Sequence, residues 1–222
     1  MKRPKTISTV LFLFSIMFLA GCAGMAKVAV RPAMEENLAV PAGKIEGDTF
    51  TGIRYPFRLS APFGWTMSME FPTFLKQWGY EPPGPGEKEQ TELYLFNPQT
   101  QSSVQIDVTP ADPYTVFTQE GLEKLVGLGA ESLKGELKEE YGQEIPLEIG
   151  PTEAFALKGV PFAAKKHVTY VAKGIKREQG WIYAFSEPYQ IFILYQLLDR
   201  NGTTDRQALE TILRSFEFGP AR

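Results

Sequence analysis

The chain has 222 residues, a net charge of −3 at pH 7 and 43% hydrophobic residues. This mildly acidic balance argues against a general nucleic-acid binder, which needs a basic surface for phosphates. With a single cysteine the domain has no disulfide, so its stability depends on its hydrophobic core.

The first 21 residues have the pattern of an export signal. Lys2, Arg3 and Lys5 precede an apolar run at residues 10–20, VLFLFSIMFLA. As a helix this run spans roughly 16 Å at ~1.5 Å per residue, too short for a bilayer core of about 30 Å. A basic start, a short apolar run and small residues after it are typical of a secretory signal. We therefore expect residues 1–21 to be a signal peptide.

The apolar run ends in Leu19-Ala20-Gly21-Cys22, which resembles the lipobox of bacterial lipoproteins. The resemblance implies cleavage between Gly21 and Cys22, transfer of diacylglycerol to the Cys22 thiol, and acylation (palmitate, for example) of the new N-terminus. Two or three acyl chains anchor a protein stably, whereas one binds marginally. The alternative is an ordinary secretory signal followed by a chance cysteine. Ala23 stands where an acidic residue commonly retains lipoproteins in the inner membrane, so in a cell with two membranes (a Gram-negative one) the resemblance implies the periplasmic face of the outer membrane.

A tether is expected to join the lipidated cysteine to the folded domain. Residues 22–47 mix small, proline and charged residues without a sustained period. A flexible coil of this length has an r.m.s. reach of roughly 25–30 Å. The alternative is that residues 25–30 add an edge strand. We expect a single folded domain over residues 48–222.

The first half of this domain predicts strands and then a helix. A strand at residues 53–61 runs into a Pro-Phe-Gly-Trp turn, and a hairpin joins residues 92–96 to residues 102–109. Helical spacing then begins at Thr118, which can cap the first turn, and stops at Gly142.

Three glycines lie inside this helical pattern, Gly127, Gly129 and Gly135. Each weakens the helix by up to ~1 kcal/mol relative to alanine. The helix must therefore gain its stability from packing on a flat surface, and small residues allow a close approach to a sheet.

The second half predicts a meander of strands at residues 153–157, 162–173, 176–185 and 190–198, followed by a helix from Thr204. The short connections between the last three strands make neighbours antiparallel. The second and fourth strands are apolar on both faces, so both faces of the sheet should be covered. The predicted fold class is α+β, with a single antiparallel β-sheet and a helix on each face.

Three short stretches resemble the PsbP-like superfamily, which includes a photosystem II extrinsic subunit, a yeast Ran-binding import factor and bacterial envelope lipoproteins. They are residues 57–65 (FRLSAPFGW), the strand pair 181–185 and 190–195, and residues 214–218 (RSFEF). The resemblance covers about residues 50–218. It implies an α-β-α sandwich that mostly binds other proteins, and it names no partner.

The sequence contains no strong catalytic motif. His167 is its one histidine and directly follows two lysines, a poor setting for a cation site or a catalytic triad. Glu139, Glu140 and Glu144 keep open a hydrolase that uses carboxylates, although acids at a helix end more often form a solvated face. We expect a protein that is not an enzyme and that uses no cofactor or metal.

Two groups of residues are candidate binding surfaces. Phe71, Phe74, Trp78 and Tyr80 lie close together, and Trp and Tyr are favoured anchors at interfaces; the alternative is that they pack into the core. The second group surrounds one hairpin and is basic: Lys165, Lys166, Lys173, Lys176 and Arg177. It would suit anionic headgroups or an acidic partner, or else protect a sheet edge from unwanted pairing.

We therefore predict a non-enzymatic, lipid-anchored protein of the cell envelope that acts as a protein-interaction or accessory module. Its membrane contact is expected through Cys22, its protein contact within residues 71–80, and no contact with nucleic acid. The alternative is a carrier of a small hydrophobic ligand or lipid in a groove between sheet and helix. The 16 phenylalanines and the helical glycines favour that alternative.

Overall fold

The computed structural model describes residues 28–222 except 79, 83, 85–89, 200–204 and 220–222. The expected export signal, Gly21 and Cys22 therefore lie outside the described residues. The elements follow the chain in this order: β1 (Gly43–Glu46), β2 (Thr49–Gly52), β3 (Phe57–Ser60), β4 (Thr66–Ser68), the 3-10 helix η2 (Thr73–Trp78), β5 (Leu93–Phe96), β6 (Ser103–Pro110), α1 (Gln119–Tyr141), β7 (Glu148–Ile149), β8 (Glu153–Ala154), β9 (Phe162–Ala172), β10 (Ile175–Ser186), β11 (Tyr189–Asp199), α2 (Arg206–Ser215) and β12 (Glu217–Phe218).

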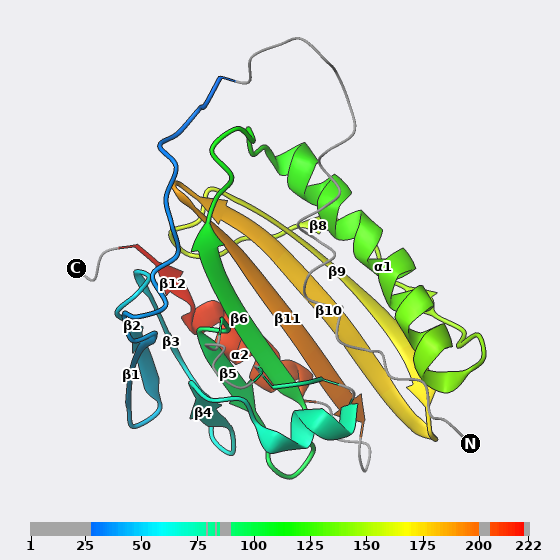
Figure 1. Cartoon of the computed structure of the whole chain (residues 1–222). Helices are drawn as coiled ribbons and strands as arrows, with labels where there is room; N and C mark the ends of the chain where they lie inside the picture. Colours follow the sequence, from blue (N-terminus) through cyan, green and yellow to red (C-terminus); the bar gives the residue numbers. More distant parts are fainter. Residues whose placement is uncertain (1–27, 79, 83, 85–89, 200–204, 220–222) are drawn as a thin grey trace.

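The described strands form two antiparallel sheets, so the prediction of a single sheet was wrong (Figure 1). The larger sheet has the order β4-β5-β6-β11-β10-β9-β7, with β8 also paired to β9, and the smaller has the order β1-β2-β3-β12. The smaller sheet arises because Arg58 of β3 lies opposite both Thr51 of β2 and Glu217 of β12. A two-residue strand such as β12 is too short to show a period in the sequence.

The predicted meander forms the centre of the larger sheet. Strand β10 pairs with β11 from Lys176↔Asp199 to Ser186↔Tyr189, and with β9 over a similar length. Lys173 and Gly174 both have positive φ, 51° and 75°, and they close the β9–β10 turn. This is the backbone that a two-residue hairpin turn requires, so the antiparallel pairing is confirmed.

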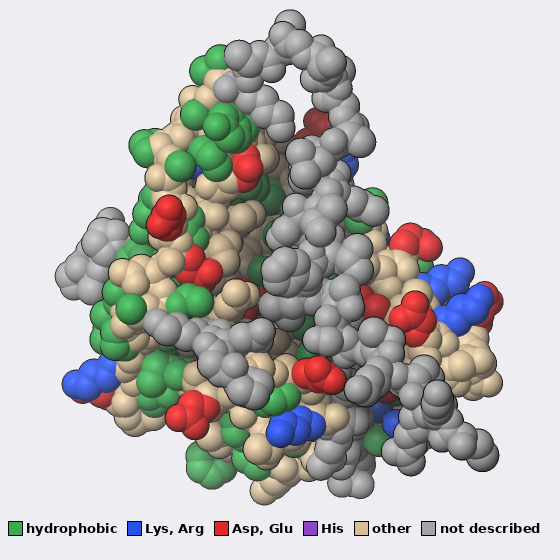
Figure 2. Space-filling view, in the orientation of Figure 1, with side chains coloured by type: hydrophobic (Ala, Val, Ile, Leu, Met, Phe, Trp, Pro, Cys, Tyr) green, Lys and Arg blue, Asp and Glu red, His purple; other side chains and the backbone are tan. Residues whose placement is uncertain are grey.

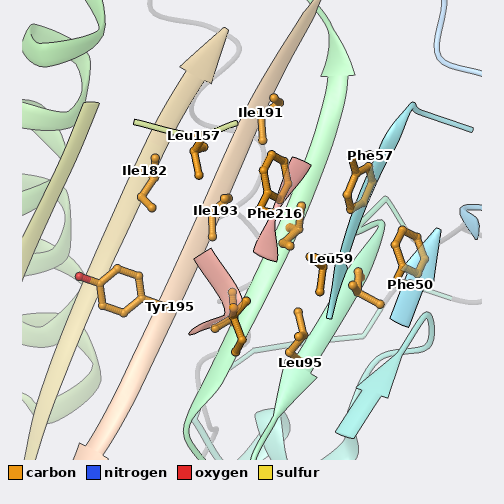
Figure 3. Packing of buried hydrophobic residues seen from close by; sticks show 14 of the residues in the cluster. Phe50, Phe57, Leu59, Leu95, Leu157, Ile182, Ile191, Ile193, Tyr195 and Phe216 are labelled. Atoms are coloured by element: carbon orange, nitrogen blue, oxygen red, sulfur yellow. The ribbon is translucent and has the colours of Figure 1, made fainter. Parts of the chain in front are cut away.

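Alternate residues of the central strands enter two separate hydrophobic cores. On one face Ile182 and Ile193 pack with α2 and with the smaller sheet (Figure 3). On the other face Trp181 and Phe185 pack under α1. Helices therefore lie on both faces, but one face is covered by α2 together with the smaller sheet. Phe57 of β3 packs between β2 and the end of α2. Its ring centroid lies 5.0 Å from that of Phe50 and 5.7 Å from that of Phe216.

Helix α1 begins and ends where the sequence predicts. The Thr118 hydroxyl accepts a hydrogen bond of 3.1 Å from the N–H of Gly121, and Gly142 ends the helix with a φ of 68°. The Thr118 cap satisfies a backbone N–H that has no partner within the helix itself, and the left-handed backbone of Gly142 is typical of a helix end.

Only one of the three interior glycines of α1 touches the sheet. A Cβ added to Gly129 would lie 2.5–2.7 Å from the Trp181 indole, whereas one added to Gly127 or Gly135 would meet nothing within 4 Å. The indole Nε1 of Trp181 donates a hydrogen bond of 2.8 Å to the Val126 carbonyl. The close approach predicted for the helix is therefore specific to Gly129.

Helix α2 is attached to the β5–β6 turn. The carboxylate of Asp205, directly before the helix, accepts a hydrogen bond from Asn97 Nδ2 at 3.0 Å and another from the Thr100 hydroxyl. The predicted first residue, Thr204, lies outside the described residues. Neither described helix is long and apolar enough to cross a bilayer.

Candidate functional site

The aromatic group predicted for partner contact does not form one exposed patch. Phe71 and Phe74 are half-buried on the outer side of β5, with ring centroids 6.0 Å from Tyr94 and 5.2 Å from Phe96. Much of the surface of both rings is therefore in contact with other residues of the domain. A role in binding stays a prediction for these two residues.

Tyr80 lies apart from this pair, towards the C-terminal end of α1. Burial and the neighbouring Tyr170, Glu136 and Glu140 raise the pKa of its phenol above its ordinary value. The Trp78 side chain lies outside the described residues. Phe71 and Tyr80 are thus near in sequence but have different surroundings.

The side chains of the basic group around the β9–β10 hairpin also do not form one surface patch. Lys165 pairs with Glu153 at 3.1 Å, the Lys173 ammonium lies 5.4 Å from the Tyr141 ring centroid, and Arg177 is buried. Lys165 and Lys173 therefore each have a local contact within the domain. Among the described residues no group of three or more His, Cys, Asp or Glu side chains could hold a metal ion.

The described part of the segment expected to be a flexible tether is instead bound to the domain near both of its ends. We call residues 28–42 the strap. Its Arg31 is buried, with 8% of its surface exposed, and Nε donates to Glu187 Oε1 at 3.0 Å. Nη1 donates to the Thr115 carbonyl at 2.8 Å and also to the Asp112 carbonyl. The folded part therefore begins before residue 48, with the strap and β1.

Aromatic rings complete the Arg31 site. The guanidinium carbon lies 5.3 Å from the Phe117 ring centroid and 5.0 Å from that of Phe185, distances at which a cation is attracted to an aromatic face. The two rings are stacked, with centroids 4.3 Å apart. The Asp112 carboxylate shapes the loop by accepting a hydrogen bond of 2.8 Å from the Tyr114 N–H. We refer to these surroundings as the Arg31 site.

A second set of buried charges holds the other end of the strap. Arg54 donates from Nη1 to Glu92 Oε1 at 2.6 Å and from Nε to the Val40 carbonyl at 2.9 Å. Glu92 is fully buried, and its Oε2 and Glu36 Oε1 accept no hydrogen bond from the described residues. Burial raises the pKa of Glu92 to about 7, because it outweighs the attraction of Arg54, and Glu36 adds to the rise.

This raised pKa predicts that stability falls as pH rises from 4.5 to 7. The folded chain holds the Glu92 proton more tightly than an unfolded glutamate, which titrates near 4.5. The stabilising contribution is therefore complete below pH 4.5 and is lost as pH rises through about 7. Glu92→Gln should flatten this slope in denaturant titrations across the range. An unchanged slope would show that other groups cause it.

An open cleft of about 500 Å³ lies between the smaller sheet and β4. We call it the turn cleft. Its lining includes Ile45, Trp65 and Met67. Phe63 stands at the rim on the turn between β3 and β4, and its side chain is fully exposed. Gly64 has a φ of 85°, which a residue with a side chain rarely adopts, so the turn that presents Phe63 depends on this glycine.

Comparison with known proteins gives a likeness in fold alone. No protein-family profile matches the chain. No curated protein sequence matches it either. The chain is similar to the solution structure of cyanobacterial PsbP (CyanoP) from Synechocystis sp. PCC 6803, with 11% sequence identity and a TM-score of 0.49. The match covers 90% of this chain and 99% of the cyanobacterial one, and no ligand or partner is carried over from it.

The Arg31 site and the turn cleft lie at opposite ends of the molecule. In Figure 1 the start of the strap and the loop before α1, which binds Arg31, are at the upper end, while β4 and the turn that precedes it are at the lower end. The sequence analysis assigned no role to Arg31 or Phe63. The sequence did contain a signal for an exposed Phe63, because this large aromatic residue lies at the tip of a Pro-x-Gly-Trp turn. Arg31 had none, because its partners lie more than 80 positions away in the sequence.

Proposed function

We propose that this chain is a lipid-anchored, non-enzymatic interaction module of the cell envelope. The observation that supports the proposal is the Arg31 site, which binds the chain nine residues beyond the proposed lipidated Cys22. A chain of nine residues spans at most about 30 Å when fully extended. A lipid at Cys22 would therefore keep the strap end near the bilayer and direct the turn cleft away from it.

A partner contact at the turn cleft agrees with this orientation. An exposed aromatic side chain beside a cleft, as Phe63 is here, is a typical anchor of a protein interface. The proposal is also consistent with the sequence resemblance to the PsbP-like superfamily, whose members mostly bind other proteins and whose matching turn includes Phe63 and Trp65. We propose an envelope protein as the partner, in the periplasm if the cell has two membranes.

Phe63→Ala is expected to abolish this contact without destabilising the domain. Because the ring is fully exposed, its removal should change the free energy of unfolding by no more than about 0.5 kcal/mol. Cross-linking in intact cells followed by purification should recover a specific partner with the wild type and lose it with Phe63→Ala. Val171→Ala, at an exposed position of β9, is the matched control and should keep the partner.

Trp78→Ala tests the contact predicted from the sequence in the same experiment. Loss of the partner with Trp78→Ala but not with Phe63→Ala would move the contact to residues 71–80. Absence of any specific partner would contradict the interaction module itself. The anchor is tested separately, because intact-mass analysis of the cell-made protein should show cleavage before Cys22 and added acyl chains.

The turn cleft also supports the alternative function, a carrier of a small hydrophobic ligand. Its volume of about 500 Å³ is within the range of small-molecule sites, and its lining mixes apolar side chains such as Ile45 and Met67 with polar ones such as Asp48 and Thr66. Native mass spectrometry of gently purified protein distinguishes the two functions. A co-purified small molecule that is lost on Met67→Glu would favour the carrier, and consistently empty protein would count against it.

A further inference from the structure

We propose that the strap end of the domain is a membrane-contact surface that rests on the bilayer in which Cys22 is anchored. This inference rests on the proposed lipid anchor and adds the face and the side chains that meet the lipid. The partner surface would then be the opposite end, at the turn cleft.

Two segments distant in sequence bring exposed apolar side chains together at this end. The strap contributes Val28 and Val30, which are 80% and 52% exposed, and the loop before α1 contributes Tyr114 and Val116, which are 49% and 69% exposed. The N–H of Val30 donates to the Pro113 carbonyl at 2.8 Å, which fixes the two segments side by side. We call these four side chains the apolar edge.

Figure 2 shows hydrophobic side chains gathered at the upper left of the molecule, where Figure 1 places the strap and the loop that leads into α1. The same end includes the one buried arginine of the strap. Because Glu187 and two backbone carbonyls bind its guanidinium, Arg31 adds no free positive charge to this surface. The apolar edge therefore suits uncharged lipid better than an acidic protein or anionic headgroups.

The length of the chain identifies the bilayer as the occupant. Val28 follows Cys22 by six residues, which span at most about 20 Å even when fully extended. A lipid on Cys22 therefore keeps the apolar edge at a high local concentration next to the membrane. Tyrosine is suited to this position because it prefers the interface between lipid and water, and the valines add apolar surface beside it. Few side chains take part, so we expect contact only in the anchored protein.

The test uses the lipidated full-length protein made by the cell, reconstituted in phosphatidylcholine vesicles. A cysteine introduced by Val116→Cys is then the single free thiol, because the Cys22 sulfur is bound to diacylglycerol. It is labelled with an environment-sensitive fluorophore. Lipids that carry a nitroxide on the acyl chain are added as quenchers. Phe63→Cys, labelled in the same way at the opposite end, is the matched control.

We expect the Val116→Cys label to lose most of its fluorescence to the nitroxide lipid and the Phe63→Cys label to keep it. Adding Arg31→Gln, which weakens the Arg31 site, should reduce the quenching at position 116. Equal quenching at both positions, or none at either with Cys22 lipidated, would overturn the membrane contact and leave the anchor intact. A free thiol at Cys22 in the intact mass would instead show that the proposed anchor itself fails.

Discussion

Arg31→Ala is expected to lower the free energy of unfolding by about 2–3 kcal/mol and to release the strap from the domain. The guanidinium makes hydrogen bonds to two carbonyls and to Glu187, and it lies against two aromatic rings. Hydrogen bonds to a charged group contribute about 1.5–3 kcal/mol, and a shielded cation–π contact adds about 1 kcal/mol. The freed strap regains conformational entropy, which offsets part of this loss.

Two measurements test the prediction for Arg31→Ala. Chemical denaturation gives the loss of stability, and limited proteolysis gives cleavage within residues 28–42, which should become fast in the variant. Arg214→Ala is the matched control, because Arg214 forms an exposed i,i+4 pair with Glu210 and should contribute less than about 0.5 kcal/mol. Equal stability and equal cleavage in Arg31→Ala and wild type would show that the strap is not bound in solution.

Gly129→Ala is expected to destabilise the domain by about 1–2 kcal/mol, although alanine is the better helix former. A Cβ at this position would overlap the Trp181 indole, so the ring must move and its hydrogen bond to Val126 is weakened. Overpacking costs about 1–3 kcal/mol, which exceeds the gain of up to about 1 kcal/mol from helix propensity.

The same helix provides controls of opposite sign. Gly127→Ala and Gly135→Ala should each stabilise the domain by up to about 1 kcal/mol, since a Cβ at these positions meets nothing within 4 Å. Thermal and denaturant unfolding of the three variants gives the comparison. The emission of Trp181 should also change in Gly129→Ala alone. A gain in stability at all three positions would mean that α1 does not approach Trp181 this closely.

Long elements were predicted well from the sequence because each shows many turns or alternations of one period. Helix α1, with its caps at Thr118 and Gly142, and the β9–β10–β11 meander are of this kind. The smaller sheet was missed, because β1 and β12 together offer only six residues. Such strands form because long-range partners pair with them, and pairing partners are not visible in a local period.

The candidate site was less predictable than the fold. The aromatic group at residues 71–80 attracts attention by composition, yet composition does not show that Phe71 and Phe74 pack on β5. Arg31 lies in a stretch of low regularity, and its burial depends on Glu187, 156 positions later. A role that depends on such distant partners becomes visible only when the loop before α1 and the β10–β11 turn are brought together.

The position of the strap before the sheets has a consequence for a protein held by its N-terminal end. A force applied through an anchor at Cys22 would act first on the few contacts of Val30 and Arg31, which belong to no strand ladder. The ladders of β9, β10 and β11 are continuous and resist together. The twelve residues from Arg31 to β1 span at most about 40 Å when fully extended, so detachment of the strap would lengthen the chain by less than this before any strand is pulled. Under such a load the strap would detach first and the sheets would stay folded.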